Sequence, residues 1–222
     1  MMGFVASEHL LSAAEEYSWL LSRAYPQKSS LKMVGDKFKL TRDMRQILYR
    51  GVSARPQAER RRKMIGRVQE GDQVLIDGYN VLFTINNYLL GRPLFISNDG
   101  LLRDAGEMRG RIQDKPVFNR AVEMMLETLS GWTGSSCRIY LDEPVSFSGR
   151  LSIVLSKEMA QMGIEGDACT VASPDHVLKH ERSDVVCTSD TAILDQYEGR
   201  VTDLPRTVLV RNFKPDFLVL DV

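Results

Sequence analysis

The sequence contains few cysteines and no long apolar segment. Its three cysteines, Cys137, Cys169 and Cys187, are an odd number without close spacing, which gives no disulfide framework and favours a reducing compartment. No apolar run reaches the ~18–20 residues that a membrane-spanning helix needs. The first 25 residues carry three glutamates among their apolar positions, unlike a secretory signal peptide. We therefore expect a cytoplasmic protein with no membrane segment.

Glycine-rich phosphate-binding loops are also absent. The sequence has neither a GxGxxG nor a GxxxxGK[ST] pattern, the loops whose backbone N–H groups cradle the phosphates of nucleotides. This absence disfavours a small-molecule phosphohydrolase or a nucleotide-binding enzyme, which stays a minor alternative.

The chain has no net charge, but its charged residues are unevenly distributed. Lys and Arg together number 29, as do Asp and Glu. Residues 1–70 hold 14 basic against 7 acidic residues, whereas residues 71–222 hold 15 basic against 22 acidic residues. A basic segment joined to an acidic one indicates two separate tasks. The basic part is suited to phosphates and the acidic part to metal ions.

Helical patterns fill the first part of the chain. Apolar residues recur at helical spacing over residues 4–23. Further helices are expected over residues 28–34 and over residues 42–50, with Thr41 as the N-cap of the latter. We interpret residues 1–68 as a small, basic helical domain.

A strongly basic run lies near the end of this domain. It could bind the backbone phosphates of a nucleic acid, or it could be an ordinary solvated linker or helix face. Its members are Arg60, Arg61, Arg62 and Lys63.

From residue 69 onward, short apolar runs alternate with helical segments. Such alternation predicts βαβ units and a parallel sheet covered on both faces. Residues 69–222 are therefore expected to form an α/β domain, interrupted by an irregular loop or arch over residues 87–113. The expected strands are residues 73–77, 137–141, 184–187 and 207–210, and the main helices are 117–129, 157–162 and 175–180.

Acidic residues follow several of the expected strands. Asp77 ends the first strand, Asp142 follows the second and Asp190 follows the third, while Asp175 lies at a helix start. Because the carboxyl ends of parallel strands meet at one edge of a sheet, these acids should converge there. Gathered carboxylates repel one another unless a cation joins them, and hard oxygen ligands suit Mg²⁺ or Mn²⁺. The pattern predicts a divalent-metal site.

Each acid also has a structural alternative. Asp77 could begin an Asp-Gly turn, Asp190 could cap the following helix, and Asp175 could complement a helix dipole. Glu143 competes with Asp142 for the position at the end of the second strand.

Four segments around these acids carry a family resemblance. They are VLIDGYNVL, CRIYLDEP, SPDHVLK and VVCTSDTAILD, and they span most of residues 72–197. The segments resemble the acid-bearing strand ends and helix start of the PIN-like superfamily, especially its NYN branch. The resemblance implies a PIN-like, Rossmann-like parallel sheet and metal-dependent hydrolysis of a nucleic-acid phosphodiester. Separately, residues 18–51 resemble the family called domain of unknown function 434, which identifies a module but no activity.

Two functional hypotheses follow. The first is a metal-dependent nuclease acting on RNA, in which Asp77 and Asp190 hold the principal Mg²⁺ or Mn²⁺ and Asp142 and Asp175 complete the site. Asn80 would contact a phosphate or orient Asp77, with a helix cap as its alternative role, and the basic run would grip the RNA backbone.

The second hypothesis is a non-catalytic nucleic-acid-binding protein on the same fold. It is motivated by the helix over residues 117–129, where the resemblance leads us to look for a further acid. Glu123 and Glu127 are present there, but the sequence does not settle which way they face.

Overall fold

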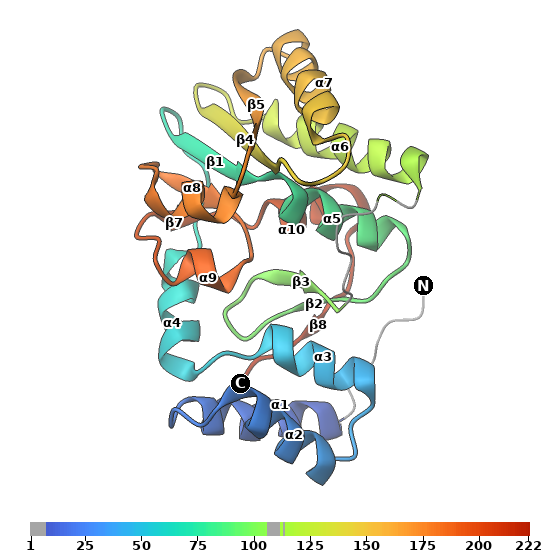
Figure 1. Cartoon of the computed structure of the whole chain (residues 1–222), viewed down its shortest axis with the longest axis vertical. Helices are drawn as coiled ribbons and strands as arrows, with labels where there is room; N and C mark the ends of the chain where they lie inside the picture. Colours follow the sequence, from blue (N-terminus) through green and yellow to red (C-terminus); the bar gives the residue numbers. More distant parts are fainter. Residues whose placement is uncertain (1–7, 106–111, 113) are drawn as a thin grey trace. The chain divides into compact units, whose positions relative to one another are not determined.

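A computed structural model describes residues 8–105, 112 and 114–222 of the chain (Figure 1). The chain forms two compact units. The first unit consists of Met1–Lys63, Gly91–Glu107 and Pro215–Val222, and the second of Met64–Leu90 and Met108–Lys214. The expected α/β class with an N-terminal helical region is confirmed. The chain first passes from one unit to the other after Lys63, near the expected boundary after residue 68. The first unit also includes two later segments.

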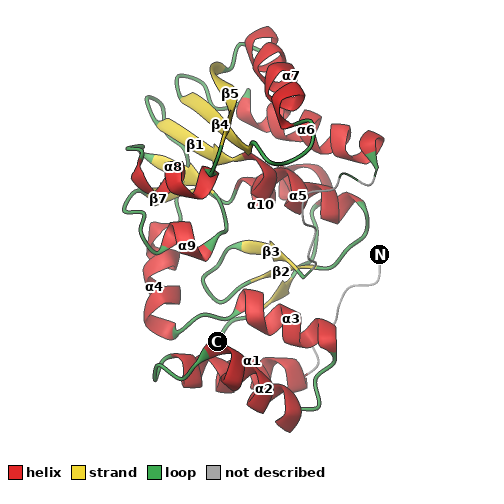
Figure 2. Cartoon of the chain, viewed as in Figure 1, coloured by secondary structure: helices red, strands yellow, loops and turns green. Residues whose placement is uncertain are grey.

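The first unit begins with four helices (Figure 2), of which the sequence predicts the first three. They are α1 (Glu8–Leu21), α2 (Gln27–Lys37), α3 (Arg42–Gly51) and α4 (Arg55–Met64). Thr41 caps α3 as expected, because its Oγ1 accepts a hydrogen bond from the backbone N–H of Met44 at 3.3 Å. The start of the expected first helix, residues 4–7, lies outside the described residues.

A small three-stranded sheet completes the first unit. Strand β2 (Leu94–Ile96) pairs antiparallel with β3 (Leu102–Asp104) and parallel with β8 (Leu218–Val219). Part of the segment expected to be an irregular loop over residues 87–113 is therefore an ordered hairpin, whereas residues 106–111 and 113 lie outside the described residues. Gly91 precedes β2 and Gly100 lies between β2 and β3, and both have a positive φ.

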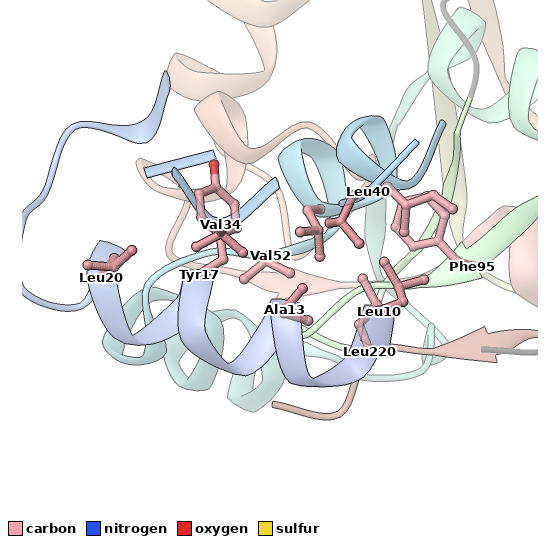
Figure 3. Close-up of a cluster of buried hydrophobic side chains, with 12 residues drawn as sticks. Leu10, Ala13, Tyr17, Leu20, Val34, Leu40, Val52, Phe95 and Leu220 are labelled. Carbon is pink, nitrogen blue, oxygen red and sulfur yellow. The ribbon is translucent and has the colours of Figure 1, made fainter. Parts of the chain in front are cut away.

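The helices and the small sheet of the first unit share one apolar core (Figure 3). Tyr17 of α1, Phe95 of β2 and Leu220 beside β8 are each buried. Gly51, at the end of α3, packs directly against this core, since an added Cβ there would clash with the side chains of Phe95 and Leu220. Burial of each large side chain contributes roughly 1.5–3 kcal/mol. The core of the helices is therefore completed by Phe95 and Leu220, from two later segments of the chain.

A buried cluster of charges links α4 to the hairpin. The Asp99 carboxylate accepts two hydrogen bonds from Arg103, both 2.8 Å, and one from Arg61 at 3.1 Å. Arg61 also donates to Ser53 Oγ at 2.8 Å. Burial opposes ionisation of Asp99, but the two guanidinium groups and a hydrogen bond from Ser97 outweigh it and hold the pKa at about 2. The ion pairs therefore join segments that are distant in sequence.

The second unit contains a five-stranded parallel sheet with the spatial order β5-β4-β1-β6-β7. Numbered by their order along the chain, these strands run third, second, first, fourth, fifth, so the winding direction reverses at β1. This is a doubly wound, Rossmann-like arrangement. The strands are β1 (Gln73–Asp77), β4 (Ser136–Asp142), β5 (Glu165–Val171), β6 (Val185–Cys187) and β7 (Arg200–Val201).

Six helices connect and cover the strands of the second unit in its described residues. They are α5 (Gly78–Leu89), α6 (Lys115–Leu129), α7 (Ser148–Gln161), α8 (Pro174–His180), α9 (Thr191–Leu194) and α10 (Leu204–Phe213). Across the described ranges, every helix is too short or too polar to cross a bilayer.

The prediction of a strand over residues 207–210 is wrong. These residues lie in α10, which begins where the Asp203 side chain accepts a hydrogen bond from the N–H of Arg206 at 3.0 Å. Pro205 occupies the first turn, where its missing N–H is harmless. Val208 and Leu209 are buried while Val210 is exposed, as expected for one face of a helix. The apolar run was too short to distinguish the two structures.

Strand β5 was not predicted from the sequence. It is an edge strand that pairs with β4 only, and its residues Glu165, Gly166 and Asp167 are exposed. A strand with this little burial lacks the apolar alternation that identifies strands in a sequence.

Replacing Asp99 by Asn should destabilise the first unit strongly. The change removes the Asp99 carboxylate charge from the buried guanidinium groups of Arg61 and Arg103, so we expect a loss of roughly 3–5 kcal/mol in the free energy of unfolding. Because the folded pKa of Asp99 lies below its ordinary value of 3.8, the wild-type advantage should be present above about pH 4 and shrink as the pH falls toward 2. Urea denaturation followed by circular dichroism measures both effects.

The matched control is Asp36→Asn. Asp36 pairs with Arg45 at 2.9 Å, but 59% of its side chain is exposed, so its loss should change the stability by less than about 1 kcal/mol. Equal effects of the two substitutions would contradict the structural importance of the buried cluster.

Candidate functional site

The candidate site lies where the winding direction of the large sheet reverses. The central strand β1 has β4 on one side and β6 on the other, and all three strands run parallel. In doubly wound folds, ligands bind outside the carboxyl ends of the strands at such a reversal point. The side chains that follow β1, β4 and β6 therefore meet at one edge.

Asp77 is the buried residue of this edge. It ends β1 and is only 6% exposed. Its Oδ2 accepts a hydrogen bond from Thr188 Oγ1 at 2.9 Å, and its Oδ1 accepts one from the N–H of Asn80 at 3.4 Å, which caps α5. Two neighbouring elements thus hold the carboxyl group in place.

The Asp-Gly pair at the end of β1 forms a strand-to-helix junction and not a hairpin turn. Gly78 begins α5 and lies against β4, where an added Cβ would stand 2.9 Å from the carbonyl oxygen of Tyr140. Only glycine permits this close approach. It lets the chain turn into α5 immediately after Asp77.

The loop after β6 is tied to the start of α5. Asn80 Oδ1 accepts hydrogen bonds from the N–H of Ser189 at 3.0 Å and from its Oγ at 3.2 Å. Asp190 caps α9 by accepting from the N–H of Ala192 at 2.7 Å, while its own N–H donates to Thr188 Oγ1 at 3.2 Å. Asp190 thus has the expected capping role, and Asn80 connects two elements.

Asp142 and Asp175 complete the set of four acids. Asp142 is the last residue of β4 and is partly buried, whereas the competing Glu143 is exposed. Asp175 lies in the first turn of α8, whose N-cap Ser173 accepts from the N–H of His176 at 3.3 Å. Asp175 is exposed at the surface of this edge.

Electrostatic coupling shows that the four carboxylates are neighbours. Burial, with a smaller contribution from the charges of Asp175 and Asp190, raises the pKa of Asp77 to about 7, although the hydrogen bonds from Thr188 and Asn80 oppose this shift. The pKa of Asp142 is raised by burial and by the charge of Asp175. The pKa of Asp175 is raised by burial and by the charge of Asp190. The charges of Asp175 and Asp190 therefore disfavour ionisation of the acids beside them.

The sequence pattern assigns no role to two residues of this edge, Thr188 and Ser189. Thr188 fixes Asp77, and Ser189 binds the amide of Asn80. Their position in the sequence could have indicated a role, because both directly precede the acid in the Thr-Ser-Asp motif after β6.

Other candidates lie elsewhere. Glu123 and Glu127 of α6 pair with Arg120 at 3.1 and 3.7 Å, and both are about half exposed. In the part of the chain that the structure describes, no group of three or more His, Cys, Asp or Glu side chains is already arranged to hold a metal ion.

The basic run belongs to α4 and has mixed roles. Arg61 is buried in the ion cluster with Asp99. Arg62 donates to the carbonyl oxygen of Asn98 at 2.6 Å and pairs with Asp221 at 2.9 Å. Arg60 and Lys63 are exposed. The exposed members of the run are thus the ones accessible to a phosphate.

The pH dependence of stability should reveal the free-energy cost of ionising the buried Asp77 carboxyl group. A folded pKa raised from 3.8 to about 7 means that stability present at low pH is lost as the pH rises between these values. Asp77→Asn does not titrate and keeps the acceptor for Thr188. Measured in EDTA, its stability relative to wild type should rise from pH 4 to pH 7 and then level off. One pKa unit corresponds to about 1.4 kcal/mol, so the gain has an upper limit of roughly 4 kcal/mol. A pH-independent difference would show that Asp77 is not strained.

Two family models match the chain. Residues 67–207 match the family described as a domain of unknown function (DUF5616), and residues 9–63 match the family described as a protein of unknown function (DUF434). The N-terminal resemblance is thereby confirmed. Neither description names an activity.

One curated relative is an uncharacterised protein of Methanocaldococcus jannaschii. It is 27% identical over 184 residues, which cover 82% of this chain and 87% of the relative. No solved structure matches the chain. Because the first family model covers well over half of the sequence, the chain belongs to the DUF5616 family and carries a DUF434 module before that domain.

Proposed function

We propose that the second unit is a PIN-like nuclease domain that hydrolyses RNA with the help of a divalent metal ion. The observation that carries the proposal is the placement of four acids at one edge of the sheet: Asp77 and Asp142 end adjacent parallel strands, Asp190 follows β6, and Asp175 lies in the first turn of α8. Free thiols at all three cysteines suit a cytoplasmic location.

The residues at this edge fit Mg²⁺ or Mn²⁺ by their chemistry. They offer hard carboxylate oxygens, which these ions prefer. Their mutual repulsion and the raised pKa of Asp77 are what a cation would relieve. No three of the described acids are already placed as a formed metal centre. This is compatible with Mg²⁺, which keeps several water ligands and often takes only one or two carboxylates from the protein.

The protein side chains would have distinct tasks in hydrolysis. Asp77 is held rigidly by Thr188, so it would provide the fixed ligand at the base of the site. Asp142, Asp175 and Asp190 are less buried and would adjust around the ion and its water ligands. When bound, the ion would activate a water molecule and neutralise charge on the phosphate that is attacked.

Asn80 is suited to orienting the substrate. Its Oδ1 is occupied by Ser189, so its amide NH₂ group is the donor that remains for a phosphate oxygen. The hydrogen bonds to Ser189 also fix the orientation of the amide. Asn80 would thereby act as a positioning residue between α5 and the loop after β6.

The basic residues of the first unit supply attraction for a polyanion. Exposed Arg60 and Lys63 on α4 add to the excess of basic residues over residues 1–70. Contacts of this kind are independent of nucleotide sequence and weaken as salt rises. Arg61 is excluded from this role because Asp99 and Ser53 already hold its guanidinium group.

A second candidate is a non-catalytic RNA-binding protein on the same fold. The observation in its favour is the absence of a formed three-ligand group among the described residues. Binding of RNA that is unaffected by metal ions, without cleavage, would support this candidate and reject the nuclease.

The nuclease proposal predicts cleavage of RNA in the presence of Mn²⁺. Asp77→Asn and Asp190→Asn should each reduce the cleavage rate by roughly 10²–10³-fold, the effect of removing one group that stabilises charge in the transition state. Gel electrophoresis of labelled single-stranded and hairpin RNA measures the rate.

The matched control for charge is Asp167→Asn. Asp167 lies exposed on β5 and pairs with Arg138 at 3.0 Å, away from the carboxyl edge of the sheet. This variant should cleave like the wild type. Cleavage that survives Asp77→Asn would remove Asp77 from the catalytic residues.

Metal binding should also be visible without activity. An ion that binds only the folded state stabilises it by about 2.7 kcal/mol at a hundredfold excess over the dissociation constant. Mn²⁺ should therefore raise the melting temperature of the wild type and of Asp167→Asn, and raise that of Asp77→Asn less. Differential scanning calorimetry measures the shifts. An equal shift in all three proteins would place any bound ion elsewhere.

A further inference from the structure

A second hollow, unrelated to the acidic edge, lies within the first unit. It has a volume of about 770 Å³ and is lined mainly by α1 with the turn after it and by α4. Asn98, Asp221 and Val222 line its other side. A hollow of this size is in the range of sites that hold small organic ligands.

One wall of the hollow is a stripe of three side chains spaced four residues apart. Glu15 and Trp19 lie on one face of α1, and Arg23 follows in the turn after the helix. Trp19 is 51% exposed, and the guanidinium carbon of Arg23 stands 3.7 Å from the centre of its ring. A large aromatic side chain is thus presented to the hollow with a cation stacked on it.

The facing wall is formed by α4 and carries charges of both signs. Arg55, Glu59 and Arg62 are spaced four and three residues apart, so they share one helix face. Arg62 is held in place by Asp221 and by the carbonyl oxygen of Asn98. The N–H of Arg55 donates to Ser22 Oγ at 2.9 Å, which joins this wall to the turn after α1.

The combination of side chains limits the chemistry of the ligand. Basic and acidic residues are balanced in the hollow, so a simple phosphate has little advantage there. An unpaired nucleotide can contact the aromatic ring, the carboxylates and the arginines of the hollow. Its base stacks on an aromatic ring, its amino and ring N–H groups donate to carboxylates, and its carbonyl and phosphate oxygens accept from arginines.

We propose that this hollow binds one unpaired nucleotide of a single-stranded nucleic acid, with its base stacked on Trp19. The inference deepens the proposed function, and rests on it, because it names the part of an RNA substrate that the first unit recognises. Glu15 and Glu59 contact the base edge, while Arg23 and Arg55 contact the phosphate. A base takes the place on the Trp19 ring that Arg23 now occupies.

The test uses Trp19 as its own reporter. Trp132→Phe removes the other of the two tryptophans. In EDTA, where no metal-dependent cleavage occurs, the fluorescence of this variant should be quenched by a short single-stranded RNA. Nucleoside monophosphates should quench it more weakly, and an RNA duplex should not quench it. Quenching by nucleoside monophosphates that is as strong as quenching by single-stranded RNA would show that the hollow recognises a free nucleotide and not a strand.

Binding of labelled single-stranded RNA, followed by fluorescence anisotropy in EDTA, tests the contribution of stacking. Trp19→Ala should weaken binding by roughly 5- to 100-fold, the range for loss of one base stack, and Trp19→Phe should restore much of it. Tyr25→Ala is the matched control, since Tyr25 is 50% exposed in the same unit but does not line the hollow. That variant should bind like the wild type.

Unchanged Trp19 fluorescence with RNA, together with wild-type affinity of Trp19→Ala, would overturn the inference. These outcomes are separable from the fate of the nuclease. Quenching by RNA in a protein that never cleaves would reject the nuclease and leave the hollow as a nucleotide site. Cleavage that is indifferent to Trp19→Ala, with no quenching, would reject the hollow alone.

Discussion

Burial of the Asp77 carboxyl group at the end of the central strand is the constraint on which the candidate site depends. A carboxylate removed from water needs hydrogen bonds or a counter-charge. Here Thr188 donates one hydrogen bond to the Asp77 carboxyl group, and the N–H of Asn80 in the first turn of α5 donates another. These contacts fix the loop after β6, and Asn80 reinforces the connection through Ser189. The other acids reach the same edge because their strands run parallel to β1. One unfavourable burial therefore organises the surrounding polar groups.

The first unit depends on a different kind of buried charge. Asp99 is paired with two buried arginines, and the apolar core beside it includes Phe95 and Leu220, from segments far along the sequence. A protein cut after residue 68 would lose these partners of its helical core. The boundaries of the two families therefore differ from those of the compact units. The DUF434 and DUF5616 matches follow one another along the sequence, whereas the compact unit that contains the DUF434 module also includes later segments of the chain.

Much of the fold and of the acidic edge could be predicted because it rests on local patterns. The apolar run that ends in Asp77 is a buried strand, and parallel strands bring their final residues together. Prediction was wrong where burial does not follow a simple pattern. The apolar run in α10 was too short to separate a helix from a strand, and the exposed edge strand β5 has no apolar alternation.

The sequence by itself determined the α/β class, the basic and acidic parts and the acids that end the strands, because periodicity, charge and strand-end position are properties of neighbouring residues. Only the tertiary structure decided the roles of individual polar groups. The basic run contains Arg60, Arg61 and Lys63, which the sequence does not distinguish. In the structure Arg61 is buried against Asp99, while the other two are exposed. Likewise Thr188 becomes the partner of Asp77 across 111 positions of sequence. Burial and pairing depend on which distant segments pack together, and a local pattern does not contain that information.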